Sequence, residues 1–190
     1  MKTGIFGGTF NPVHIGHVKA AIAFIREMQL DRLFVLPNFI PPLKDRESAP
    51  ASDRLEMLKI AFLDVKNAII DDFELKSGGT SYTYKTIAHY KALYPDDRFY
   101  LLIGDDNLLI FRKWRNFEYI LKNCVLCVAM RANMDIAEEK HILERDYGAQ
   151  IHILQYSPTV ISSTELRSKL LPEYLPDGVF EYIRQKGLYQ

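Results

Sequence analysis

Cysteine and tryptophan are scarce in this chain of 190 residues, and net charge is absent. There are two cysteines and one tryptophan, and 24 lysine and arginine residues balance 24 aspartate and glutamate residues. A balanced charge creates no global field that would attract nucleic acid or an anionic membrane, so we expect neither as a partner. Apolar runs such as Ala20–Ile25 are far shorter than a transmembrane helix, and Met1–Phe10 lacks the apolar core of a signal peptide. We therefore predict a cytoplasmic protein.

The two cysteines, Cys124 and Cys127, have the C-x-x-C spacing of some redox and zinc sites. They lie, however, in a run of apolar residues that is typical of a buried strand. Reactive pairs are instead expected at the start of a helix. We predict two reduced structural thiols and no metal held by protein side chains.

Short apolar runs alternate with longer amphipathic stretches along the chain, whose length fits one domain, residues 1–190. The expected strands are Thr3–Phe6, Arg32–Leu36, Ala68–Phe73, Arg98–Ile103, Cys124–Met130 and Gln150–Leu154. The expected helices are Ile15–Gln29, Ser52–Val65, Thr83–Tyr94, Phe117–Lys122, Ile136–Tyr147, Ser162–Leu170 and Asp177–Lys186. This alternation predicts an α/β fold, with a mostly parallel sheet and helices on both faces. Ligands of such sheets bind beyond the carboxyl ends of the strands.

The segment GGTFNPVHIGH, residues 7–17, follows the first expected strand. Gly7 and Gly8 allow a ligand to approach the backbone closely, and the amides that open the next helix can receive phosphate oxygens. The i, i+3 spacing of His14 and His17 lets both imidazoles face one site, where they can donate to charge on phosphate. An isolated pair would be read as surface, capping or metal-binding residues, but its place after a strand and a Gly-Gly turn favours phosphate.

A second segment, ISSTELR, spans residues 161–167. Ser162 and Glu165 have the spacing of a capping box, and Arg167 adds a charged fork suited to phosphate one turn later. Alone, the segment indicates only a capped helix. Together with the histidine segment, it suggests the other half of a triphosphate site.

These two segments resemble the signatures of the nucleotidyltransferase superfamily with the H-x-G-H motif. Within it, the chain resembles the bacterial nicotinate-nucleotide adenylyltransferases, from Gly4 to the closing Gly187–Tyr189. The resemblance implies a Rossmann-like, doubly wound fold. It also implies transfer of AMP from ATP to nicotinate mononucleotide, giving deamido-NAD and pyrophosphate in NAD biosynthesis. Mg²⁺ would be carried mainly by the ATP phosphates.

The resemblance also implies roles for individual residues. The catalytic residues would be His14, His17, Lys44 and Arg167, with Lys44 in the proline-rich loop Asn38–Ala51. ATP would be bound by Gly7, Gly8, Thr9, Phe10, His14, His17, Ser162, Ser163, Thr164 and Arg167. The acceptor would be bound by Ser81, Tyr82, Thr83, Gly104, Asp106 and Trp114, with Trp114 stacked on the pyridine ring.

Two residues depart from the family pattern: Lys85 stands where Asp is usual, and Asp105 stands where a small residue is usual. Alternatives also stay open at this point. Gly79–Thr86 nearly matches a P-loop, but Tyr84 replaces a required glycine. Related enzymes use nicotinamide mononucleotide, phosphopantetheine or CTP, and a nucleotide sensor could share the fold. The sequence does not determine whether the chain forms a homo-oligomer.

Overall fold

The computed structural model describes residues 1–40, 49–131, 134–159 and 161–189. Within them, six parallel strands form one sheet in the order β3-β2-β1-β4-β5-β6. The strands are β1 (Lys2–Gly8), β2 (Arg32–Pro37), β3 (Ala68–Ile70), β4 (Arg98–Gly104), β5 (Cys124–Ala129) and β6 (Ile151–Ile153). The predicted Rossmann-like α/β fold is therefore confirmed.

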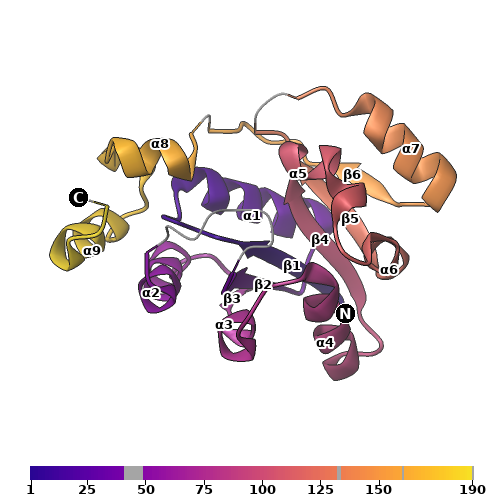
Figure 1. The fold of residues 1–190 in the computed structure, drawn as a ribbon, viewed down its shortest axis with the longest axis horizontal. Helices are drawn as coiled ribbons and strands as arrows, with labels where there is room; N and C mark the ends of the chain where they lie inside the picture. The colour runs from indigo at the N-terminus through magenta and orange to yellow at the C-terminus, as the bar shows by residue number, and fades with distance from the viewer. Residues whose placement is uncertain (41–48, 132–133, 160, 190) are drawn as a thin grey trace.

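Helices cover both faces of this sheet (Figure 1). They are α1 (Ile15–Met28), α2 (Ala51–Ala61), α3 (Phe73–Ser77), α4 (Thr83–Leu93), α5 (Asp105–Leu109), α6 (Phe117–Asn123), α7 (Ala137–Tyr147), α8 (Ser163–Ser168) and α9 (Val179–Lys186). Short 3-10 helices span Phe111–Lys113 and Pro172–Tyr174. Helices α1, α2, α8 and α9 contribute to one apolar core, and α4 to α7 contribute to the other.

The two cores exist because successive side chains of a strand point to opposite faces. In β1, Phe6 joins the core beneath α1, whereas its neighbour Ile5 joins the core beneath α4. Because both faces are buried, the strands need apolar residues at every position, as in the run from Leu33 to Leu36.

The same alternation places the two cysteines on opposite faces of the sheet. Cys124 and Cys127 lie three residues apart in β5, so they face different cores, and neither forms a disulfide. Burial is the main cause that raises the pKa of both thiols to about 12. The predicted buried strand is confirmed.

The expected elements differ from the structure mainly in two places. The third strand ends at Ile70 rather than Phe73, because the Asp71 carboxylate accepts the Phe73 amide at 2.8 Å and turns the chain into α3. Helix α5 begins directly after β4 and was not predicted, since five residues are too few to show a helical period. In the part of the chain that is described, no helix is long and apolar enough to cross a membrane.

Candidate active site

The order in which strands are added to the sheet reverses between β1 and β4, which lie side by side, parallel, at the centre of the sheet. After β1 the chain continues to β2 on one side, and after β4 it continues to β5 on the other. Such a reversal opens a crevice beyond the carboxyl ends of the strands. Gly7 and Gly8 end β1, and Gly104 ends β4, so the predicted ATP and acceptor segments start at the same edge.

The two histidines lie against each other at the start of α1. Their ring centroids are 3.7 Å apart, and the His14 backbone amide donates to His17 Nδ1 at 3.2 Å. Gly16, between them, leaves the space for this arrangement, because a Cβ there would lie 3.0 Å from His14 Nδ1. The glycine of the H-x-G-H motif is therefore explained by the seating of the His14 ring.

His14 and His17 have different environments. His14 is 4% exposed, and its Nδ1 has no hydrogen-bond partner among the described residues, whereas His17 is half-buried. Burial, followed by the charge of Arg131, lowers the pKa of His14 to about 4. His14 is therefore neutral near pH 7, and it can offer one N–H donor to a phosphate oxygen.

Phe10 forms a wall of the histidine site. Its ring is 2% exposed and makes an edge contact with the His17 ring, with 5.1 Å between centroids. A Cβ on Gly8 would lie 2.9 Å from the Phe10 ring, so this packing requires glycine at position 8. Phe10 itself has a left-handed φ of 47°. Its ring is buried, so any contact of Phe10 with ATP would be made by its backbone.

Helix α8 brings the second predicted segment to the histidine loop. Arg167 Nη1 donates to the Asn11 carbonyl at 2.8 Å, and Ser163 Oγ donates to the Pro12 carbonyl at 3.0 Å. The predicted cap is confirmed, since Ser162 Oγ accepts the Glu165 amide at 3.1 Å. The Arg167 guanidinium also donates to Thr164 Oγ1 at 3.1 Å. Two segments about 150 residues apart in sequence therefore lie side by side, whereas Lys44 lies outside the described residues.

The predicted acceptor segment lies at the start of α4, where Tyr82 is the N-cap residue and Thr83 the first residue of the helix. Ser81 is buried, and its Oγ accepts the Phe39 amide at 2.9 Å, so this hydroxyl is already engaged. Two cations lie near the Tyr82 ring: Lys85 Nζ is 5.8 Å and Arg115 Cζ is 5.1 Å from its centroid.

The other predicted acceptor residues follow β4. Both oxygens of Asp106 accept from Arg131, the nearer contact at 2.7 Å. A Cβ on Gly104 would lie 2.4 Å from Asp106 Oδ1, so glycine permits this ion pair. Half-buried Trp114 rests against the Phe111 ring, with 5.1 Å between centroids.

Sequence reasoning left Asp105 unexplained and missed Arg131. Asp105 is fully buried, and its carboxylate accepts the amides of Asp106 and Met134. It therefore fixes the turn into α5. Arg131 follows the carboxyl end of β5, a position that could have identified it. Because its charge lowers the pKa of His14 while it binds Asp106, Arg131 links the histidine and acceptor segments.

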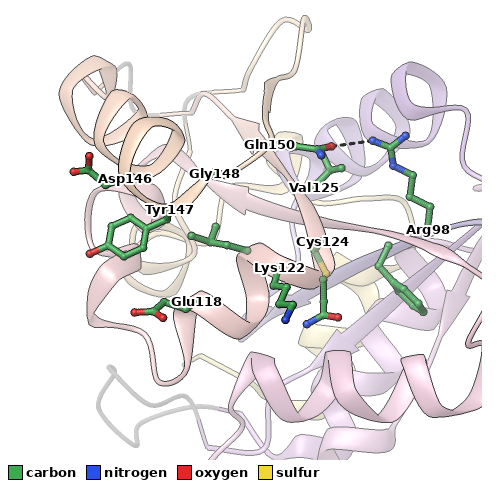
Figure 2. Close-up of a pocket in the computed structure, with 12 residues that line it drawn as sticks. Arg98, Glu118, Lys122, Cys124, Val125, Asp146, Tyr147, Gly148 and Gln150 are labelled. Atoms are coloured by element: carbon green, nitrogen blue, oxygen red, sulfur yellow. Dashed lines mark hydrogen bonds between the residues drawn. The ribbon is translucent and has the colours of Figure 1, made fainter.

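A cavity at the opposite ends of the strands, their amino-terminal ends, is separate from this site (Figure 2). It lies at the amino ends of β4 and β5, between α6 and the end of α7, and is lined by Arg98, Phe99, Glu118, Leu121, Lys122, Asn123, Cys124, Val125, Asp146, Tyr147, Gly148 and Gln150. The dashed line in Figure 2 is a 2.9 Å hydrogen bond from Arg98 to Gln150. None of the predicted site residues lines this cavity.

The P-loop alternative does not fit the local structure. A P-loop connects a strand to a helix, but here α3 precedes the segment, and Tyr84 already lies inside α4.

In the described ranges, no group of three or more His, Cys, Asp or Glu side chains could hold a metal ion.

Comparison with known proteins gives consistent matches. The cytidylyltransferase-like family model matches residues 5–169. The probable nicotinate-nucleotide adenylyltransferase of Clostridium acetobutylicum is 37% identical, and the alignment covers 99% of this chain and 98% of that protein. The protein of the same description from Caldicellulosiruptor bescii is 38% identical over the full length of both chains. In fold, the chain is similar to Plasmodium falciparum nicotinic acid mononucleotide adenylyltransferase complexed with APC, with a TM-score of 0.81, 20% identity and coverage of 99% and 96% of the two chains.

Proposed function

The chain belongs to the nicotinate-nucleotide adenylyltransferases of the cytidylyltransferase-like family, and from this premise we propose that it joins ATP and nicotinate mononucleotide. The products are deamido-NAD and pyrophosphate, a step of NAD biosynthesis. Mg²⁺ enters as the complex of ATP, held by phosphates and water rather than by a cage of protein ligands.

The observation that carries the proposal is the meeting of α8 with the histidine loop. Arg167 bonds to Asn11, three residues before His14, whose ring lies against that of His17. A guanidinium, two imidazoles and the N-terminus of the 14-residue helix α1 all favour an anion at this point. Such a convergence suits the triphosphate of ATP.

The proposed mechanism needs alignment and charge stabilisation more than acid–base chemistry. The 5′-phosphate of the acceptor is already an anionic nucleophile at neutral pH, and it attacks the α-phosphorus of ATP in line as pyrophosphate leaves. His17 holds the α-phosphate, and neutral His14 donates to a neighbouring phosphate oxygen. Arg167 stabilises charge on the leaving pyrophosphate, together with Lys44.

The acceptor half of the site favours a negatively charged ring substituent. Lys85 and Arg115 lie on the Tyr82 ring, and neither takes part in an ion pair among the described residues. Their positive charge supports nicotinate, which carries a carboxylate, over nicotinamide, which carries a neutral amide. Trp114 offers its indole for stacking on the pyridine ring, and Tyr82, Thr83, Gly104 and Asp106 complete the proposed contacts.

One assay tests the proposal against its alternatives. The protein is incubated with ATP and Mg²⁺ plus nicotinate mononucleotide, nicotinamide mononucleotide or phosphopantetheine, and pyrophosphate release is measured. We expect the fastest release with nicotinate mononucleotide. Release only with phosphopantetheine would assign a different acceptor, and no release with any acceptor would favour a nucleotide sensor.

A further inference from the structure

Arg54 of α2 is a buried cation that the proposed mechanism does not use. It is 1% exposed, and none of the ion pairs formed by the described residues includes it. Its guanidinium donates instead to three backbone carbonyls, those of Thr9 at 2.8 Å, Asn38 at 2.7 Å and Ala49 at 3.1 Å. Burying a charge is costly, and the three hydrogen bonds to carbonyls offset part of that cost. They also tie three backbone segments to one side chain, which an apolar residue could not do.

All three carbonyls belong either to the loop between β1 and α1 or to residues that hydrogen-bond to that loop or to the end of β1. Thr9 is part of this loop. The Asn38 amide donates to the Gly8 carbonyl at 2.9 Å, and the Ala49 amide donates to Asn11 Oδ1 at 3.0 Å. Arg54 therefore braces the loop directly at Thr9 and, through one further hydrogen bond each, at Gly8 and Asn11.

The bond to Thr9 also sets the direction of a peptide dipole. In a trans peptide, the carbonyl of one residue and the N–H of the next point in opposite directions. With the Thr9 carbonyl turned to Arg54, the N–H of Phe10 faces away from it. The negative end of this dipole is thus held at the guanidinium, while the positive end remains on the other side of the loop, an arrangement that suits anion binding.

We propose that Arg54 is a positioning residue for the triphosphate half of the site, acting through the Gly8–Asn11 loop and adding close to it a positive charge that pairs with no carboxylate among the described residues. This inference rests on the proposed function, since it assigns the loop to ATP. Arg54 does not touch the substrate. It holds the peptide groups that do, and its loss should weaken ATP binding more than acceptor binding.

The test compares Arg54→Met and Arg54→Lys with a matched control, Arg32→Met. Arg32 is also largely buried, but it binds Thr3 and Asp97 at the amino end of the sheet, away from the site. Each variant is examined by urea unfolding, by titration with inorganic tripolyphosphate, and by KM for ATP and for nicotinate mononucleotide. The kinetic values are expressed per folded molecule.

For Arg54→Met we expect KM for ATP to rise, and affinity for tripolyphosphate to fall, by about ten-fold or more. This is the size of effect expected when charge-assisted hydrogen bonds are lost. KM for the acceptor should change by less than about three-fold. Arg54→Lys keeps the charge but cannot reach three carbonyls, so an intermediate loss is expected. Arg32→Met should lower stability alone.

Unchanged ATP and tripolyphosphate binding in folded Arg54→Met, or an equal rise of both KM values, would overturn the inference. If that variant does not fold, Arg54→Lys decides the matter, and wild-type affinity for tripolyphosphate would then overturn it. If the wild-type protein failed to use nicotinate mononucleotide, the proposed function would fall. The tripolyphosphate titration would still test Arg54.

Discussion

At the scale of the residue, the proposed site contains two imidazoles in different environments. His14 is buried and neutral, and its seat requires glycine at position 16. His17 is half-buried, with Phe10 packed against its edge. His17 is thus the histidine with more room to meet a ligand, whereas buried His14 can offer only its one N–H donor.

Replacement of His17 tests this division. His17→Ala removes a donor to the charge that develops in the transition state, so kcat should fall by roughly 10²–10³. The lost bond from the His14 amide should cost stability only about 1 kcal/mol. Steady-state kinetics and thermal unfolding measure the two effects. A folded variant with wild-type kcat would contradict the mechanism.

Arg167 is expected to act on ATP in particular. Because it bonds to Asn11 and carries charge to the histidine loop, Arg167→Ala should raise KM for ATP, or lower kcat/KM, by about ten-fold or more. The KM for the acceptor should change much less. Arg167→Lys is the control, since it keeps the charge and loses the fork. Normal ATP kinetics in Arg167→Ala would reduce Arg167 to a residue that only docks α8.

At the scale of the element, the start of α4 would form the environment of the acceptor in the proposed site. Ser81 ties this start to the chain after β2 through the Phe39 amide, and the Ser81 amide donates to the Ile40 carbonyl at 2.9 Å. The buried Glu74 of α3 accepts the Thr86 hydroxyl at 2.6 Å. Burial raises the pKa of Glu74, although hydrogen bonds with the Thr86 and Ser81 side chains oppose this rise. The segment is therefore anchored, and Lys85 and Arg115 lie near its Tyr82 ring.

Acceptor preference follows from this element. We predict a kcat/KM for nicotinate mononucleotide at least about ten-fold above that for nicotinamide mononucleotide. Trp114→Ala should weaken both acceptors, since stacking contacts the ring rather than its substituent. Lys85→Ala and Arg115→Ala should instead reduce the ratio.

The measurement is a side-by-side comparison of the two acceptors at saturating ATP. Lys91, on the same helix as Lys85, provides the control substitution Lys91→Ala. Equal efficiency of both acceptors in the wild-type protein would refute this interpretation of α4 and leave adenylyl transfer in place.

At the scale of the whole molecule, acid should destabilise the fold in two stages. The pKa of His14 falls from 6.5 to about 4 on folding, mainly through burial. Burial opposes the shift of Asp97, but hydrogen bonds from Thr3, Arg32 and the N-terminal amine lower its pKa from 3.8 to about 2. In both cases the unfolded chain binds the proton more tightly, so protonation favours unfolding.

The free energy of unfolding should therefore decrease as pH falls from 6.5 towards 4, and again from 3.8 towards 2. Urea unfolding across this range measures it. His14→Gln should flatten the upper stage, and Asp97→Asn should remove the lower one at a cost of roughly 2–3 kcal/mol near neutral pH. A wild-type profile in His14→Gln would contradict the assignment of the upper stage.

The sequence by itself determined the alternating elements, the parallel α/β class and the family, because apolar periodicity and contiguous motifs are local patterns. It predicted the histidine loop and the cap at Ser162, where chemistry and spacing lie within a few residues. The sequence did not predict helices α3 and α5, since five residues carry too little periodicity to be recognised.

Only the tertiary structure decided which distant groups meet. Arg54 lies within the expected helix Ser52–Val65, where nothing in the sequence marks it, yet its guanidinium binds the Thr9 carbonyl in the loop that precedes α1. Arg131 pairs with Asp106, and Arg167 reaches Asn11 across 156 positions. The physical reason is that buried polar groups must find partners, and in a doubly wound sheet those partners come from loops that are adjacent in space but remote in the chain.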